Sequence, residues 1–561
     1  MRPSVAVAIA SLVGMLPACG RAQDQKSVTP PRLVVLGAVD QLAAWVFAAG
    51  RPHLAADGGF ARLAREGVTF THCAYEHACT ETGPGHATVG TGVAANVHGI
   101  VRNKWWVPAQ QKAIYCVEEK AAALPGLPEG KDRGPGLMLA PTLAESVKRG
   151  VPGSLAGSVA WKDRSAICMA GPHADLAVWC ENATGRFVTN TKWAQTTPQW
   201  LQLWNGRAVV DQWFRTRWER CGPDAAYADL VDDRPYEMAH FNGSRQRTLP
   251  AWLDGGGNKP GLEYYTQIYN SPFGNTAVRL AAEAMVRGMG LGADTTPDVL
   301  CVSFSSTDLV GHYFGPDSVE ARDTLLRLDR ELATFLQFLD AQVGVGQWAM
   351  FLTADHGVGM TPEWAKAQGK DAGRGAIQTF VGAAVEKALR DKFGEPAAGK
   401  RYQTHVGEFS IFFDDALLDA VRGSRSLAEV RLEAAQIAAA AATKVPGLAA
   451  AYATDDLLAG RVPGDPIVES LKKALAPGRA GEVQLVIKPG WLDGTTPASH
   501  GTPHPYDREV VAFAIGGGAP AGVVEDQPIT PGFGATWFRA RLGLPRAAGS
   551  SDTVPASFRL P

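Results

Sequence analysis

The sequence lacks a dominant charge, a long apolar run and any internal repeat. Its 561 residues include 54 basic and 56 acidic side chains, for a net charge of -2. Proteins that bind nucleic acids usually carry a basic surface, so the charge balance argues against that class. The apolar stretch near the N-terminus is short and soon gives way to polar residues, unlike a membrane span. With 46% hydrophobic residues, the chain is typical of a globular protein with a large core.

Cysteines at C-x-x-C spacing are also missing, so the sequence indicates neither a redox motif nor a cysteine zinc site. Segment 1–19 has the features of an export signal: Arg2, a short apolar stretch and small residues before Cys19. Its last residues, LPAC, resemble the bacterial lipoprotein box, in which Cys19 would carry lipid and anchor the protein to a membrane. Ordinary cleavage nearby, releasing a soluble protein, is the alternative. We therefore expect a periplasmic or extracellular protein, or an outer-membrane lipoprotein.

Export would place the remaining cysteines in an oxidising compartment, where disulfides persist. Cys301 lies in an apolar, strand-like run and is expected to be a buried, unpaired thiol. The others could form three disulfides, whose pairing the sequence does not determine. They are Cys73, Cys79, Cys116, Cys168, Cys180 and Cys221.

Short apolar runs alternate with longer helical patterns, such as Ser318–Leu339. This alternation predicts an α/β fold: a three-layer sandwich with a mostly parallel central sheet covered by helices on both faces. In such sheets ligands bind beyond the carboxyl ends of the strands. The expected buried strands are Leu33–Val39, Leu155–Trp161, Val299–Phe304, Trp348–Leu352, Val483–Ile487 and Val510–Ile515.

Two long segments interrupt this alternation. Residues 171–285 are rich in Trp, Asn, Gly and charge and show weak periodicity. Residues 373–480 contain an alanine-rich helical run, Leu427–Val445. We interpret both as insertions that form a cap over the ligand-binding edge of the sheet, within one catalytic domain spanning 30–561. A monomer is expected.

Asp and His residues follow several of the expected strands. Each has an ordinary explanation by itself, as a surface pair or a capped loop, but buried carboxylates require partners. Oxygen and nitrogen ligands without thiolates suit zinc, with manganese or iron as chemical alternatives. His504, four residues after His500, is a competing ligand. Together the residues predict a site for two zinc ions, formed by Asp40, Asp308, His312, Asp355, His356 and His500.

A hydroxyl group stands near this set at Thr82, before Gly83-Pro84-Gly85 and a helical stretch expected from about His86. Thr82 could simply cap that helix. Alternatively, the amides at a helix start bind an anion, and the hydroxyl could act as a nucleophile once a metal or base removes its proton.

Further groups suited to an anion follow another strand. Lys162 and Arg164 come after LAGSVAW, and their cationic groups match phosphate oxygens, although a basic pair at a strand end is usually solvated. Asn103 could donate one more hydrogen bond. Trp105 and Trp106 would line the pocket or belong to the core.

Taken together, these segments resemble the alkaline phosphatase superfamily, and within it the exported bacterial enzymes of the phosphate-irrepressible type with a threonine nucleophile. The resemblance covers about residues 33–170, 290–360 and 490–520; the two insertions match only in position. The motifs are VD at Asp40, TGPGH at Thr82, HGI followed by RNKWW, KDR at Lys162, TDLVGH, TADHG and SHGTPHPYD.

The resemblance implies a role for each of these residues. Asp40, Asp355, His356 and Thr82 would hold one zinc, and Asp308, His312 and His500 the other. Thr82 would form a phosphothreonine intermediate that water hydrolyses, releasing inorganic phosphate. The remaining phosphoryl oxygens would be held by Lys162, Arg164 and Asn103, with the Gly83 amide available to the phosphate. The expected substrates are small phosphate monoesters.

Other functions fit less well. A phosphodiesterase or nucleotide pyrophosphatase of the same superfamily is the main alternative, and a binding or structural protein without turnover is a second. The stretch TETGPGHA lacks the C-x-P-x-R or S-x-P-x-R pattern of sulfatases. Cofactor-independent phosphoglycerate mutases usually use serine and manganese in the cytoplasm, which the export signal contradicts.

Overall fold

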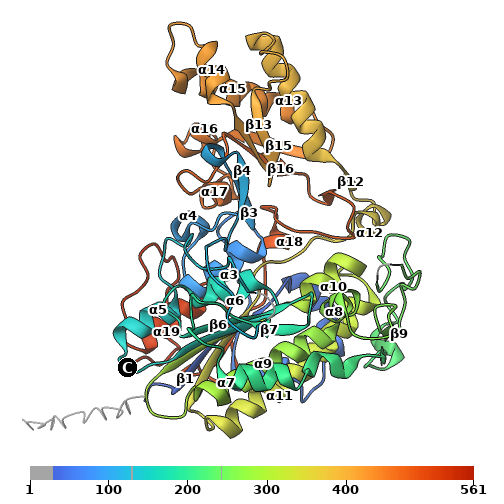
Figure 1. The fold of residues 1–561 in the computed structure, drawn as a ribbon, viewed down its shortest axis with the longest axis vertical. Coiled ribbons are helices and arrows are strands. Elements are labelled where there is room, and N and C mark those ends of the chain that lie inside the picture. Colours follow the sequence, from blue (N-terminus) through green and yellow to red (C-terminus); the bar gives the residue numbers. More distant parts are fainter. Residues whose placement is uncertain (1–28, 128–129, 242) are drawn as a thin grey trace, which may run out of the picture.

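A nine-stranded sheet forms the centre of the larger lobe in the computed structural model, which describes residues 29–127, 130–241 and 243–561 (Figure 1). Its strands lie in the order β19-β2-β18-β11-β1-β10-β5-β6-β7. Their bounds are β1 (Leu33–Val39), β2 (Gly67–Phe70), β5 (Ala156–Ala160), β6 (Leu176–Glu181), β7 (Arg186–Val188), β10 (Asp298–Phe304), β11 (Trp348–Thr353), β18 (Phe513–Gly516) and β19 (Val523–Glu525).

The middle of this sheet is parallel. β1 pairs in parallel with β10 on one side and β11 on the other, and β5 and β6 continue the parallel part beyond β10. β7 and β18 pair antiparallel to their neighbours nearer the centre of the sheet. All seven residues of β1 are buried, which is why its sequence is continuously apolar rather than alternating. The predicted mostly parallel sheet is confirmed.

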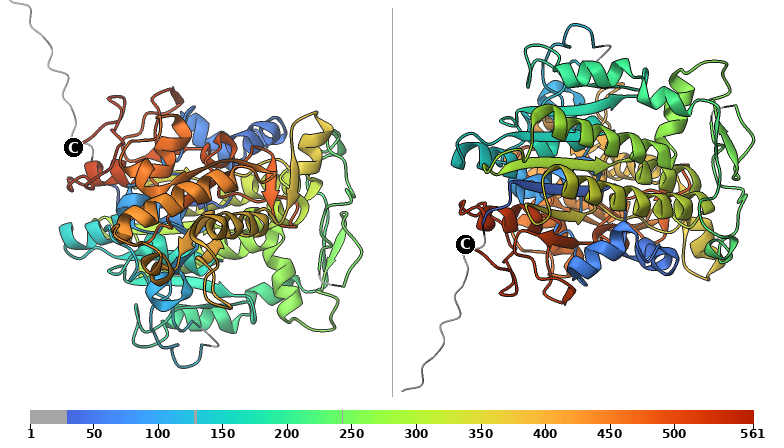
Figure 2. Two further views of the ribbon diagram at one scale, coloured as in Figure 1. Left: turned by 90° about the horizontal axis from the view of Figure 1, so that it is seen from above. Right: turned by 90° about the horizontal axis from the view of Figure 1, so that it is seen from below.

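Helices cover both faces of the sheet, as the α/β prediction requires. α3 (Thr82–Thr91), α6 (Asp163–Ala170) and α19 (Phe533–Arg541) pack on one face. On the other face lie α9 (Pro272–Met289) and α11 (Val319–Gln342), seen across the near side in the right-hand view of Figure 2. The Ser318 hydroxyl accepts a hydrogen bond from the Ala321 amide and so caps α11 at the expected position.

A smaller lobe stands over one end of the sheet (Figure 1). It contains a four-stranded sheet in the order β13-β14-β16-β15, with α13 (Ile377–Phe393) and α15 (Leu427–Ala442) packed on it. These strands are β13 (Gln403–Gly407), β14 (Ser410–Phe413), β15 (Leu448–Ala453) and β16 (Val483–Ile487). The expected strand Val483–Ile487 therefore does not belong to the central sheet. A buried apolar run looks alike in either sheet, because only its partners differ.

The segment 171–285 does not form a cap as a whole, contrary to the sequence prediction. It contributes β6 and β7 to the edge of the central sheet, and α9 covers one of the sheet's faces. Long irregular stretches separate these short elements and obscure their periodicity. A two-stranded sheet of β8 (Thr216–Trp218) and β9 (Ala251–Leu253) lies outside the central sheet.

The described cysteines are all unpaired, so the disulfides that the sequence left possible are not present among them. Most of these thiols are buried and pack as small apolar side chains. Cys301 is fully buried in β10, as predicted, and burial raises the pKa of its thiol to about 12. The export segment and Cys19 lie outside the described residues. Within the described part of the chain, no helix is long and apolar enough to span a membrane.

Candidate metal centre and active site

The predicted site residues meet beyond the carboxyl ends of four adjacent strands. Asp40 directly follows β1, and Asp355 lies two residues after β11. Asp308 lies in the first turn of α10 (Ser306–Phe314), which follows β10, and Lys162 follows β5. Because β11, β1, β10 and β5 are neighbours, their carboxyl ends deliver these side chains to one crevice. The sequence prediction of a site at this edge agrees with the geometry.

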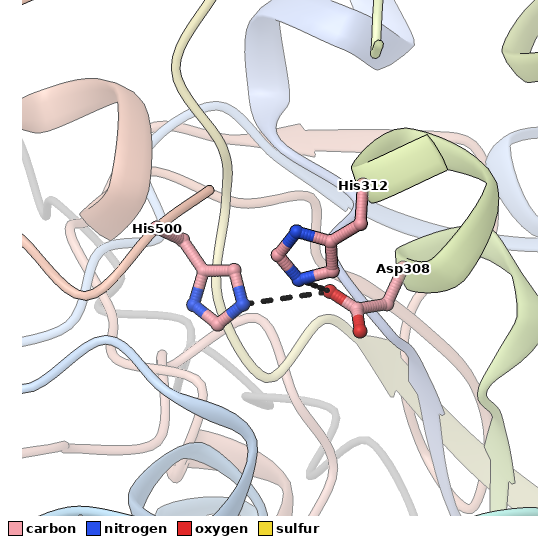
Figure 3. Close-up of side chains that lie close together, drawn as sticks. All are labelled: Asp308, His312 and His500. Carbon is pink, nitrogen blue, oxygen red and sulfur yellow. Dashed lines mark ion pairs between the residues drawn. The ribbon is translucent and has the colours of Figure 1, made fainter. Parts of the chain in front are cut away.

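Asp308, His312 and His500 form the first group of potential metal ligands (Figure 3). The Asp308 Oδ1 atom lies 3.2 Å from His312 Nε2 and 3.5 Å from His500 Nε2. Each imidazole donates its Nδ1 proton to a backbone carbonyl, of Ala498 for His312 and Thr80 for His500. Both Nε2 lone pairs are therefore left to face the carboxylate, as metal-binding histidines require.

The competing ligand His504 lies away from this group. Its Nε2 atom donates to the carbonyl oxygen of Ile487 at 2.7 Å, in the smaller lobe. His500 is thus the imidazole that the SHGTPHPYD loop brings to the site.

Asp40, Asp355 and His356 form a second group beside the first. The His356 Nε2 atom lies 3.5 Å from Asp40 Oδ1 and 3.4 Å from Asp355 Oδ2, and all three side chains are fully buried. Asp40 Oδ1 and His356 Nε2 lack hydrogen-bond partners among the described residues. Buried carboxylates without hydrogen bonds are costly. The group therefore fits a bound cation.

Lys162 places a positive charge between the two groups. Its ammonium lies 2.7 Å from Asp40 Oδ2 and 2.6 Å from Asp308 Oδ2, and the residue is only 4% exposed. Burial alone would raise the pKa of Asp308, but His312 and Lys162 hold it well below its usual range. The pKa of Asp40 is raised well above its usual value by burial and by the neighbouring Asp355 carboxylate. The ionised form of Asp40 is therefore disfavoured unless a cation lies beside it.

Thr82 is the first residue of α3, so the helix begins earlier than the sequence suggested. Glu81 occupies the capping position, and the alternative that Thr82 merely caps the helix is wrong. The Thr82 hydroxyl oxygen lies 3.3 Å from both Lys162 Nζ and Arg164 Nη2. A hydroxyl at a helix start between two cations is well placed to carry negative charge.

Asn103 is held beside Thr82 by two hydrogen bonds. Its backbone amide donates to Glu81 Oε2, and its Oδ1 atom accepts from the Gly83 amide, both at 2.7 Å. The Gly83 amide is therefore not available to a phosphate, contrary to our expectation. The bond instead fixes the orientation of Asn103, whose Nδ2 group has no acceptor in the described structure.

Two further residues at the site were not predicted. His86 lies one turn after Thr82, with Nδ1 3.2 Å from Asp355 Oδ2 and 2.8 Å from the Thr82 carbonyl oxygen, and Nε2 2.7 Å from Ser303 Oγ. With both nitrogens in hydrogen bonds, it orients Asp355 better than it could bind a metal. The i, i+4 spacing from Thr82 was the available signal.

Tyr115 is the second. Its hydroxyl donates to Asp163 at 2.6 Å and accepts from Arg164 Nη1 at 3.3 Å, so it orients the guanidinium toward Thr82. No motif in the sequence links Tyr115 to this arginine.

Trp105 and Trp106 take different roles. Trp105 is buried in a core cluster. Trp106 stacks on His405 of the smaller lobe, with ring centroids 4.7 Å apart.

Comparison with known proteins now identifies the family. Residues 34–502 match the model for type I phosphodiesterase / nucleotide pyrophosphatase. The chain belongs to this family. The resemblance to the alkaline phosphatase superfamily is confirmed, and the family match spans both lobes.

Individual relatives in this family are similar along most of their length. Alkaline phosphatase PhoV of Synechococcus elongatus is 29% identical over 515 residues, covering 90% of this chain and 89% of the relative. A Myroides odoratus protein named calcium-transporting ATPase is 30% identical over 512 residues, covering 88% of each chain. The crystal structure of alkaline phosphatase PafA superposes with a TM-score of 0.84 at 25% identity, covering 95% of this chain and 99% of that one.

Proposed function

We propose that this family member is an exported, zinc-dependent alkaline phosphatase that hydrolyses phosphate monoesters through a phosphothreonine intermediate. The observation that carries the proposal is the Thr82 hydroxyl, placed between Lys162 and Arg164 at the rim of two metal-binding groups. Similarity to PhoV and PafA, both named alkaline phosphatases, supports it.

The residues present fit two zinc ions. One would be held by Asp40, Asp355, His356 and Thr82, and the other by Asp308, His312 and His500. Three carboxylates and three imidazoles match the ligand preferences of zinc, and Asp40 Oδ1 and His356 Nε2 are buried without hydrogen-bond partners in the described structure. When bound, two such ions supply Lewis-acid stabilisation at the attacking and the leaving oxygens of an in-line displacement.

The chain's own groups account for the other requirements of phosphoryl transfer. Lys162 and Arg164 bind and orient the non-bridging phosphoryl oxygens. The Nδ2 group of Asn103 donates a further hydrogen bond to these oxygens. The Thr82 oxygen attacks phosphorus while the bond to the leaving alcohol oxygen breaks. Water then attacks the phosphothreonine, the bond to Thr82 breaks, and inorganic phosphate is released.

Monoesters suit this site better than diesters. A monoester presents three non-bridging oxygens and close to two negative charges, which match the two fixed cations Lys162 and Arg164. A diester presents two oxygens and one charge, and its second organic group would crowd Arg164 and Tyr115.

Release of inorganic phosphate from an aryl phosphate monoester by zinc-loaded protein tests the proposal. The matched control is Thr82→Ala, which lacks only the hydroxyl and a methyl group. Turnover by the native chain and its loss in the control are expected. A native chain that binds zinc but releases no phosphate would contradict the proposal and favour a non-catalytic protein.

We further propose that the protein acts as a monomer in the periplasm or outside the cell, with Cys19 as a candidate lipid anchor. The basis is segment 1–19 and its LPAC ending. Mass spectrometry of the mature N-terminus, with cell fractionation and gel filtration, checks each part. A mature chain that retains segment 1–19 in the cytoplasm would contradict export.

A further inference from the structure

The turn between β13 and β14 carries backbone strain. It consists of two residues, Glu408 and Phe409, with φ angles of 47° and 59°. Two-residue hairpin turns of this kind favour Asn and Gly, because other side chains are disfavoured in the left-handed region. A phenylalanine at such a position costs stability, and strain of this sort clusters at functional sites.

Several contacts hold this turn in place. The Phe409 amide donates to Gln378 Oε1 at 2.9 Å, and its carbonyl oxygen accepts from the Leu485 amide at 2.8 Å. His405 Nε2 lies 2.9 Å from Glu408 Oε2. The backbone is therefore fixed on both sides, and the direction of the Phe409 side chain is determined by the smaller lobe.

The Phe409 ring reaches from the smaller lobe to the active site. It packs against Gly501, the residue after His500, where an added β-carbon would stand 3.2 Å from Phe409 Cε2. The Arg102 guanidinium lies 4.9 Å from the ring centroid. Arg102 in turn donates to the Gly501 carbonyl and to Glu81, the residue before Thr82, at 3.0 Å each.

Phe409 and His500 both line a small pocket of about 40 Å³, together with Met360, Trp491 and Ser499. In an in-line displacement the leaving oxygen departs on the side opposite the nucleophile. In the proposed mechanism Thr82 belongs with Asp40, Asp355 and His356, so the leaving oxygen would depart toward the other group of potential metal ligands, Asp308, His312 and His500. Because His500 belongs to that group and also lines the pocket, the leaving alcohol would lie on the side where Phe409 and Met360 stand.

We propose that Phe409 is a specificity-determining residue that limits the bulk of the leaving alcohol. The inference rests on the proposed phosphatase function and adds a preference among its substrates: monoesters of small alcohols over monoesters of bulky alcohols of similar acidity. The strained turn holds the ring at the wall of the pocket, where a bulky leaving group would collide with it.

Two primary alkyl esters, ethyl phosphate and cyclohexylmethyl phosphate, test this role of Phe409, because their leaving alcohols differ in bulk far more than in acidity. Phe409→Gly removes the ring and suits the left-handed turn, so the hairpin is expected to persist. In this variant kcat/KM for the bulky ester should rise roughly tenfold relative to the small ester. Phe409→Trp should shift the same ratio in the opposite direction.

Glu408→Gly is the matched control, because it relaxes the same turn while keeping the ring. It should leave the ratio of the two esters at the native value. Inhibition by inorganic phosphate, which has no leaving group, should stay unchanged in all three variants. If the kcat/KM ratio of the two esters is unchanged in Phe409→Gly, or changes equally in Glu408→Gly, the proposed role of Phe409 is wrong but the proposed function stands. A native chain that hydrolyses neither ester nor an aryl phosphate would instead overturn the proposed function, and with it the proposed role of Phe409.

Discussion

The ammonium of Lys162 lies 3.3 Å from the hydroxyl oxygen of Thr82. The same nitrogen contacts Asp40 and Asp308, one from each potential metal group. Lys162 thus links the nucleophile to both groups from the end of β5. A cation at this distance lowers the cost of negative charge on the Thr82 oxygen and on a phosphoryl oxygen beside it.

Replacing Thr82 tests the nucleophile. Thr82→Ala should lower kcat/KM for an aryl monoester by roughly three orders of magnitude or more, because no other side chain supplies the attacking oxygen. Thr82→Ser keeps that oxygen and should retain part of the activity. Thermal unfolding and zinc content should stay near native, since six protein ligands remain. Near-native turnover by Thr82→Ala would mean that water attacks the substrate directly.

Removing both cations tests substrate binding. Lys162→Ala with Arg164→Ala should lower kcat/KM for monoesters by about two to four orders of magnitude, because charge-assisted hydrogen bonds contribute about 1.5–3 kcal/mol each. Diesters use these contacts less and should lose less activity. Steady-state kinetics with matched aryl esters gives both values. Equal losses for the two classes would count against a monoester-selective site.

Metal analysis tests the two groups of ligands. Native protein should contain about two zinc ions per chain and lose activity on chelation. Asp308→Asn should reduce the content to about one, because Asp308 belongs with His312 and His500. His504→Ala is the control and should keep both ions, since His504 bonds to Ile487 instead. Full activity with one ion per native chain would refute the two-metal site.

Glu320 makes the stability of the fold pH-dependent. It is fully buried in the first turn of α11, and neither carboxylate oxygen has a hydrogen-bond partner in the described structure. Burial, and then Asp232, raises its pKa from 4.5 to about 8. Between about pH 4.5 and pH 8 the folded state therefore binds a proton that the unfolded state has lost. The free energy of unfolding falls as the pH rises through this range.

Glu320→Gln removes this titration. Its free energy of unfolding should fall less than that of the native chain between about pH 5 and pH 8.5, with a difference of a few kcal/mol. Denaturant unfolding at several pH values measures how the free energy of unfolding changes with pH in the native chain and in the variant. Glu237, whose pKa is also raised to about 8, keeps titrating in the variant, so some dependence should remain. Identical slopes would show that Glu320 is ionised in the folded protein.

Much of the site could be predicted because strand ends carry clear signals. A carboxylate directly after a buried run, as at Asp40, has few structural explanations, and the parallel sheet brings several such residues together. A residue that orients another site residue, rather than binding a ligand itself, carries no such signal in the sequence. Tyr115, at the end of β4 (Lys112–Tyr115), reaches Arg164 because it lies beside the start of α6, and no sequence pattern indicates that neighbourhood.

The errors in the fold prediction have a related cause. The run Val483–Ile487 is buried and apolar in either sheet, so its composition could not reveal its partners β14 and β15. The Gly83 amide was expected to face phosphate because glycine leaves an amide accessible. The side chain of Asn103, twenty residues later, occupies it instead.

The most direct test of the account is the ratio of kcat/KM for an aryl phosphate monoester to that for the corresponding diester, measured with zinc-loaded protein. Because Lys162 and Arg164 match the charge and oxygens of a monoester, we predict a ratio well above one. A native enzyme that hydrolyses the diester more efficiently would contradict the account and indicate a phosphodiesterase.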